Sequence, residues 1–289
     1  MISGILIRFA YWLRIRRVKD STLYPLARKI CAFKLHEHEV HTLVLGSSHA
    51  QMGYLAKKGE FNLGLASQDL YYTYELYRRY GMHVRDIVVF YSVFSGGSYT
   101  LKTNYAVACD SYKVVAGIDW PDETEAKKRQ LHLMLGAYRR KMQRLLRRNS
   151  VNCDDLGNEE LYCPFFASSA EERAKAHLKS LHRDIDMGIF LERLIGEAMT
   201  RGQRVWVVIP PACQGYRKVV NAVTGPFDRA WSAANKYENA TVLDYFNDKD
   251  FNDGDFIDFD HLGKAGAAKM SAKIRADVER RSVNNVNTL

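Results

Sequence analysis

The stretch HTLVLGSSH, residues 41–49, decides the fold class that this sequence predicts. Its first half is a short apolar run of the kind that forms a buried strand, and it ends directly in the turn-forming residues Gly46, Ser47 and Ser48. Three other runs have the same character: 86–91 (DIVVFY), 204–210 (RVWVVIP) and 240–245 (ATVLDY). We therefore expect these four segments to be strands of one sheet.

Helical patterns alternate with these strands, at about 67–80, 126–148, 170–201, 216–236 and 264–281. Strands followed by helices are typical of a three-layer α/β/α domain with a central, mainly parallel sheet. Residues from about 98 to 165 do not follow the alternation and are interpreted as an insertion, a kind of segment that often covers the active site of an α/β enzyme.

Composition restricts the partners without choosing one. The chain has 289 residues, 47% of them hydrophobic, and a formal net charge of +9, which favours anionic partners such as an acidic polysaccharide or an anionic membrane surface. No nucleic-acid recognition motif accompanies the charge, so nucleic acid is disfavoured. The five cysteines are scattered and form no CxxC pair, which favours a reducing compartment and a cytoplasmic location.

Residues 1–35 are interpreted as an N-terminal amphipathic helical segment, and residues 36–289 as the α/β domain. The apolar run near the N-terminus is too short to span a bilayer, which takes about 18 apolar residues. Arginines and a lysine flank it, so the segment could lie on the inner membrane surface as a peripheral anchor, or pack on its own domain. The basic helix expected at 126–148 has the same two interpretations, a face for an anionic partner or a solvated surface.

Chemistry is expected where strands end, because ligands of an open α/β sheet bind at the carboxyl ends of its strands. Ser48 follows the first strand directly, and near the C-terminus the chain reads DFIDFDHLG, residues 255–263. A serine hydroxyl becomes a good nucleophile when an imidazole removes its proton and a carboxylate holds that imidazole. Asp258 and His261 could supply both partners. The alternative is an acidic helix cap in which Asp260 caps and His261 is incidental.

The GSSH block after the first strand and the DFDHL block near the C-terminus together resemble the SGNH (GDSL-like) hydrolase superfamily, in a bacterial branch with Gly-Ser-Ser in place of Gly-Asp-Ser. The resemblance covers about residues 43–274. It implies that Ser48 is the nucleophile, that Ser47 stands in place of the usual Asp, and that Asp258 and His261 complete the triad. It also implies an oxyanion hole formed by the N–H groups of Ser48 and Gly64, the latter within FNLG.

The third block of the family departs from its pattern in this chain. Where the family usually has Gly-x-Asn-Asp, residues 91–97 read YSVFSGG, without an asparagine. A backbone N–H or a hydroxyl between Ser92 and Ser95 could replace the missing donor, Asn62 or Gln68 could reach in, or the site could be weakened. Loss of one oxyanion donor typically lowers the rate on the order of 10²- to 10³-fold.

The resemblance implies a serine esterase or O-acyltransferase, with acetyl as the expected acyl group, that acts on a carbohydrate or glycan through an acyl-enzyme and needs no cofactor. The substrate would be an ester-bearing small molecule or a glycan. The alternative is a catalytically decayed SGNH-fold protein that binds anionic membrane or glycan surfaces. The cluster HEHEVH at residues 36–41 lacks the HExxH spacing, and we expect no metal site there.

Overall fold

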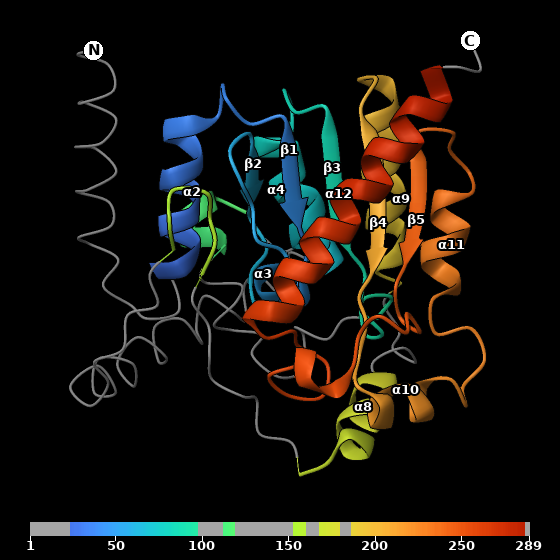
Figure 1. The fold of residues 1–289 in the computed structure, drawn as a ribbon. Coiled ribbons are helices and arrows are strands. Elements are labelled where there is room, and N and C mark those ends of the chain that lie inside the picture. Colours follow the sequence, from blue (N-terminus) through green and yellow to red (C-terminus); the bar gives the residue numbers. More distant parts are fainter. Residues whose placement is uncertain (1–23, 98–111, 119–152, 160–167, 180–185, 287–289) are drawn as a thin grey trace, which may run out of the picture.

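The computed structural model describes residues 24–97, 112–118, 153–159, 168–179 and 186–286. Its five described strands form one parallel sheet in the order β2-β1-β3-β4-β5 (Figure 1). Their bounds are β1 (Thr42–Leu45), β2 (Glu60–Asn62), β3 (Asp86–Phe90), β4 (Arg204–Ile209) and β5 (Ala240–Asp244). All four strands predicted from the sequence are present, and the sheet also contains the short strand β2.

Helices cover both faces of the sheet, so the predicted α/β class with a central parallel sheet is confirmed. One face carries α2 (Tyr24–His36), α4 (Leu70–Tyr80), α9 (Gly188–Thr200) and α11 (Asp228–Ala234); the other carries α3 (Ser48–Gly53) and α12 (Lys264–Val286). Figure 1 shows α12 crossing this second face. The described chain also contains α8 (Ala170–Leu178), α10 (Gln214–Val220), the π-helical turn η1 (Tyr112–Ala116) and the 3₁₀ turn η2 (Asp253–Asp255). Among these helices, none combines the length and the apolar composition of a membrane-spanning segment.

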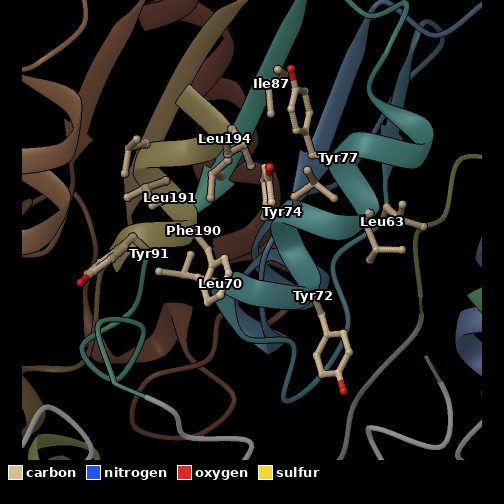
Figure 2. Packing of buried hydrophobic residues seen from close by; sticks show 14 of the residues in the cluster. Leu63, Leu70, Tyr72, Tyr74, Tyr77, Ile87, Tyr91, Phe190, Leu191 and Leu194 are labelled. Atoms are coloured by element: carbon tan, nitrogen blue, oxygen red, sulfur yellow. The ribbon is translucent and has the colours of Figure 1, made fainter. Parts of the chain in front are cut away.

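Alternation along each strand divides the core between the two faces. Leu43 and Leu45 of β1 pack in the larger cluster with α4 and α9, whereas Val44 between them packs in the smaller cluster with α12. This is the period-two pattern of a strand that is buried on both sides. Figure 2 shows part of the larger cluster, which includes Tyr74 and Tyr77 of α4 and Leu191 and Leu194 of α9. Tyr71, Tyr72, Tyr74 and Tyr77 of α4 are buried in this core, and Tyr80 at the end of the helix is partly buried.

Two predicted helices are interrupted. The segment 216–236 divides into α10 and α11, with Gly225 at φ 65° and Pro226 between them, a sequence that does not continue a helix. The segment 170–201 divides into α8 and α9, and residues 180–185 lie outside the described residues. The helix expected at 126–148 also lies outside them, as does most of the interpreted insertion.

Helix α2 packs on the sheet domain through Leu26, Ile30 and Phe33, which are buried. This part of the predicted N-terminal segment therefore belongs to the core of its own domain. Residues 1–23, which carry the flanking basic residues expected at a membrane surface, lie outside the described residues.

Asp86, at the start of β3, ties this strand to the neighbouring strand β4 through its buried carboxylate. It accepts hydrogen bonds from Nε and Nη2 of Arg204 at 2.7 and 2.9 Å, from Nε1 of Trp206 at 3.0 Å and from Nε of Arg85 at 2.8 Å. Burial raises the pKa of this carboxyl, but these donors together outweigh burial and hold the pKa below its ordinary value.

Replacing Asp86 with asparagine is expected to lower the free energy of unfolding at pH 7 by about 2 kcal/mol, the scale of hydrogen bonds to a charged group. Because the folded-state pKa is lowered, this contribution is present above the unfolded pKa of about 3.9 and is lost as the pH falls through the folded value. Urea unfolding of the wild type and of Asp86→Asn, at pH 7 and at low pH, measures the difference in their free energies of unfolding. If this difference were as large in acid as at pH 7, the account would be contradicted.

Candidate active site

The turn between β1 and α3 places Ser48 at the carboxyl edge of the sheet. Gly46 takes a φ of 135°, and a Cβ there would lie 3.0 Å from both Cβ and O of Phe90 on β3. Only glycine fits this turn without strain. Ser47 is the N-cap residue, and Ser48 is the first residue of α3, so its N–H is one of the amides that helix geometry leaves without an intrahelical acceptor.

Asp258 and His261 reach Ser48 from the loop between η2 and α12. His261 Nε2 lies 2.7 Å from Ser48 Oγ, and His261 Nδ1 lies 2.8 Å from Asp258 Oδ2. The other carboxylate oxygen, Oδ1, accepts the backbone N–H groups of Asp260 and His261 at 3.0 and 2.7 Å, which fixes the loop. The structure thus brings the three predicted residues together, although 213 positions separate Ser48 from His261.

The charges in this hydrogen-bonded chain suit proton transfer from Ser48. Burial raises the pKa of Asp258, but the hydrogen bond from His261 outweighs it and holds that pKa below its ordinary value, so the carboxylate is ionised at neutral pH. An ionised Asp258 next to Nδ1 places the imidazole proton on that nitrogen. The Nε2 atom of His261 then has a lone pair directed at the Ser48 hydroxyl.

Gly64 and Asn62, which the sequence offers as oxyanion donors, are hydrogen-bonded within the protein in this structure. The Gly64 N–H donates to Asn62 Oδ1 at 3.0 Å, and Asn62 Nδ2 donates to the carbonyl oxygens of Ala50 and Tyr54 at 2.9 and 2.7 Å. Asn62 is fully buried. Together these hydrogen bonds tie the end of β2 and the loop after it to helix α3.

The close approach of this loop to α3 explains why residue 64 is a glycine. A Cβ at Gly64 would lie 2.6 Å from Ala50 Cβ and 2.8 Å from the Gln51 nitrogen, closer than atoms in contact allow. Any larger side chain must push the loop and the helix that carries Ser48 apart.

Replacing Gly64 with alanine is expected to lower the free energy of unfolding by about 1–3 kcal/mol, as overpacking typically does, and to slow reaction at Ser48. The control is Gly202→Ala, because Gly202 has a φ of 66° and nothing within 4 Å of a built Cβ. The control introduces strain without touching α3. The labelling rates of the two variants with a serine-directed probe separate displacement of α3 from general backbone strain. Equal labelling rates would contradict the inference that Gly64 allows the loop to lie close to α3.

The other candidates for the missing oxyanion donor are also engaged elsewhere. The Ser92 N–H donates to Ser95 Oγ at 2.9 Å, and Ser92 Oγ lies 2.8 Å from His49 Nδ1. Gln68 Nε2 donates to Thr73 Oγ1, and Gln68 Oε1 accepts from Tyr112. In this structure Ser92 and Gln68 are therefore hydrogen-bonded within the protein. Ser92 stays one of the predicted alternatives for the missing donor, and the Ser48 N–H stays the predicted donor.

A second buried chain of polar groups lies beside the first and was not predicted. His49 Nε2 lies 3.1 Å from Asp260 Oδ2, and the ring of His49 stacks on that of His261 with centroids 4.7 Å apart. Arg173 of α8 donates to Asp260 Oδ1 at 3.0 Å. The signal in the sequence was the histidine directly after Gly-Ser-Ser and the second aspartate of DFDH, whose partner in α8 no local pattern reveals.

Ligand-type atoms of His49, Asp260 and His261 lie within 4.8 Å of one another. The ring nitrogens of His261 are hydrogen-bonded to Asp258 and Ser48, and His49 Nδ1 to Ser92. His49 Nε2 lies 3.1 Å from Asp260 Oδ2. Because both nitrogens of His261 already have protein partners, we assign no metal to this set.

A cavity of about 470 Å³ lies at the opposite end of the sheet, between the amino ends of the strands and α12. Its lining includes the ion pairs of Arg204 with Asp86 and of Arg275 with Glu60. It is separate from Ser48 and its partners.

Comparison with models of known protein families finds none that matches the chain, and comparison with curated proteins also finds no match. Among solved structures, a similarity is found to a protein of Desulfitobacterium hafniense described as a lipolytic protein of the G-D-S-L family. It covers 80% of this chain and 96% of that chain, at 12% identity and a TM-score of 0.35. At these values the similarity carries no argument about function, which depends on the geometry of the site itself.

Proposed function

We propose that this chain is a serine esterase or O-acyltransferase of the SGNH type that works through an acyl-enzyme on Ser48. The observation that carries the proposal is the continuous chain from Ser48 Oγ to His261 at 2.7 Å and from His261 to Asp258 at 2.8 Å, at the carboxyl edge of a parallel sheet. A nucleophile, a base and a group that orients the base are the three roles that acyl transfer requires.

The proposed reaction has two halves. In the first, His261 Nε2 accepts the hydroxyl proton as Ser48 Oγ bonds to the ester carbonyl carbon, and the Ser48 N–H donates to the resulting oxyanion. The C–O bond to the leaving alcohol then breaks, and the alcohol takes the proton from His261. In the second half, water or a sugar hydroxyl gives its proton to His261 and attacks the acyl carbon. The acyl C–O bond to Ser48 then breaks, and Ser48 Oγ takes that proton back from His261 Nε2. Water gives an esterase, and a sugar gives an O-acyltransferase.

We propose a carbohydrate ester with a small acyl group as the substrate. Ser48 is 8% exposed and His261 is 1% exposed, so a small acyl group such as acetyl is favoured over a long acyl chain. The formal net charge of +9 favours an acidic glycan or an anionic membrane surface as the setting of the reaction. The choice of carbohydrate rests on the family resemblance and is an analogy.

The test is acetyl release from p-nitrophenyl acetate and from an acetylated acidic polysaccharide, with and without an unacetylated glycan acceptor. We expect release above the Ser48→Ala background, with an acetyl group on Ser48 in intact protein quenched during turnover. An acceptor that gains acetyl identifies a transferase. Release at the Ser48→Ala level with every substrate would contradict the proposal and favour a protein that binds anionic surfaces without catalysis.

A further inference from the structure

Asp260 is a deeply buried charge directly beside the proposed catalytic histidine. The residue is 2% exposed, and its carboxylate is surrounded by groups from three elements. Arg173 donates to Oδ1 at 3.0 Å, His49 Nε2 lies 3.1 Å from Oδ2, and His177 Nδ1 lies 3.6 Å from Oδ2. On its own loop, His261 Nδ1 lies 3.6 Å from Oδ1.

The neighbouring histidines are neutral near pH 7. Burial lowers the pKa of His49, and burial lowers the pKa of His177 to about 3. His177 Nδ1 also lies 2.7 Å from the Tyr216 hydroxyl of α10. For Asp260, burial raises the pKa, but the surrounding imidazoles, with His261 first, hold it well below its ordinary value. Among the residues that the structure describes, the carboxylates of Asp258 and Asp260 lie 2.8 and 3.6 Å from His261 Nδ1, and the guanidinium of Arg173 is paired with Asp260.

These fixed charges favour proton transfer to His261. In the described part of the chain, these two carboxylates and one guanidinium contribute one net negative charge while the imidazoles are neutral. A proton arriving on His261 offsets that contribution, so the imidazolium is formed in surroundings that compensate it. In a buried cluster such a balance matters more than at a surface, because solvent screens it less.

We propose that Asp260, held by Arg173 and His49, is a positioning residue that sets the charge balance in which His261 takes up the serine proton. Its importance for turnover rests on the proposed function. Stacking of His49 on His261 at 4.7 Å, with 24° between the rings, keeps the two imidazoles in register, and the hydroxyl of Ser92 holds the far side of His49.

Two variants that remove opposite charges test this proposal. Asp260→Asn removes the negative charge, and we expect the protonation midpoint of His261 to fall by about one pH unit, the scale of a charge at 4–6 Å. Arg173→Gln removes the positive charge and leaves Asp260 uncompensated, so the midpoint is expected to rise by a similar amount. A purely structural role would not move the two midpoints in opposite directions.

The readout is NMR titration of histidine rings labelled at Cε1, with the His261 signal assigned by its absence from His261→Ala. Arg173→Lys retains the charge and is expected to stay near the wild-type midpoint. Lys175→Gln makes the same change of charge on the same helix, but at a side chain that is 61% exposed, and is expected to have no effect. If Asp260→Asn does not fold, the contrast between Arg173→Gln and Arg173→Lys tests the proposal alone.

The pH dependence of labelling by a fluorophosphonate, measured on the same proteins, separates this inference from the proposed function. If the NMR midpoints of the two variants shift in opposite directions, and the acidic limb of the labelling profile shifts in the same way, both the inference and the proposed function are supported. Opposite titration shifts in the two variants, together with no fluorophosphonate labelling of the wild-type protein, would support the charge balance and overturn the enzyme proposal. Shifts in the same direction, or none, in folded variants would overturn the inference.

Discussion

His261→Ala is expected to lower the rate of ester cleavage on the order of 10⁵- to 10⁶-fold, the largest effect in this set of predictions. The reason is geometric, since His261 Nε2 lies 2.7 Å from Ser48 Oγ and is the base best placed to take the hydroxyl proton. Asp258→Asn should cost about 10⁴-fold, because the neutral amide no longer holds the correct tautomer. Steady-state rates on an activated acetyl ester measure both.

The control is His83→Ala, because His83 is exposed and remote in sequence from both blocks of the site. This variant should retain the wild-type rate. If His261→Ala cleaved the ester nearly as fast as His83→Ala, His261 would not be the base. The alternative interpretation, in which Asp260 caps a helix and His261 is incidental, would then be favoured.

Lys29→Met is expected to lower the free energy of unfolding by about 3–5 kcal/mol, the cost of breaking a buried pair by removing one partner. The Lys29 ammonium is fully buried and donates to the carbonyl oxygens of Asn62 and Gly64 at 3.2 and 2.7 Å. It also lies 3.1 Å from Glu159 Oε1, whose side chain is 1% exposed. Without it, a buried carboxylate and two carbonyls lose their cation.

Urea unfolding with linear extrapolation measures this loss, and a second substitution separates its causes. The double variant Lys29→Met/Glu159→Gln lacks the buried, uncompensated carboxylate charge of Glu159. Part of the lost stability is therefore expected to return. The control Lys175→Met breaks a pair with Glu171 in which both side chains are more than 60% exposed, and should cost less than about 1 kcal/mol. Equal losses for Lys29→Met and Lys175→Met would contradict the account.

The elements that the sequence predicted best are those with a strong local signal. Strands β1, β3, β4 and β5 are continuous apolar runs, and each lies within one or two residues of its predicted bounds. Strand β2 (Glu60–Asn62) has three residues and only Phe61 as an apolar one, so no local pattern distinguishes it from a loop. Its position is fixed by pairing with β1, which is a contact between segments.

In the site as well, residues with a local sequence signal could be predicted, whereas contacts between distant segments could not. Ser48, Asp258 and His261 stand in two blocks of sequence that could be paired by a resemblance, and the structure brings them together. The hydrogen bonds of Gly64 and Asn62 could not be predicted, because they depend on how the loop after β2 lies against α3. The pairing of Asp260 with Arg173 joins residues 87 positions apart, and no spacing rule relates them.

The central claim is that Ser48 is an activated nucleophile, and covalent labelling by a fluorophosphonate probe tests it most directly. Intact mass and peptide mapping should show one probe per chain on the peptide that contains residues 47 and 48. The label should disappear in Ser48→Ala, persist in Ser47→Ala and require His261. Absence of labelling in well-folded protein, or labelling that persists in Ser48→Ala, would contradict the account.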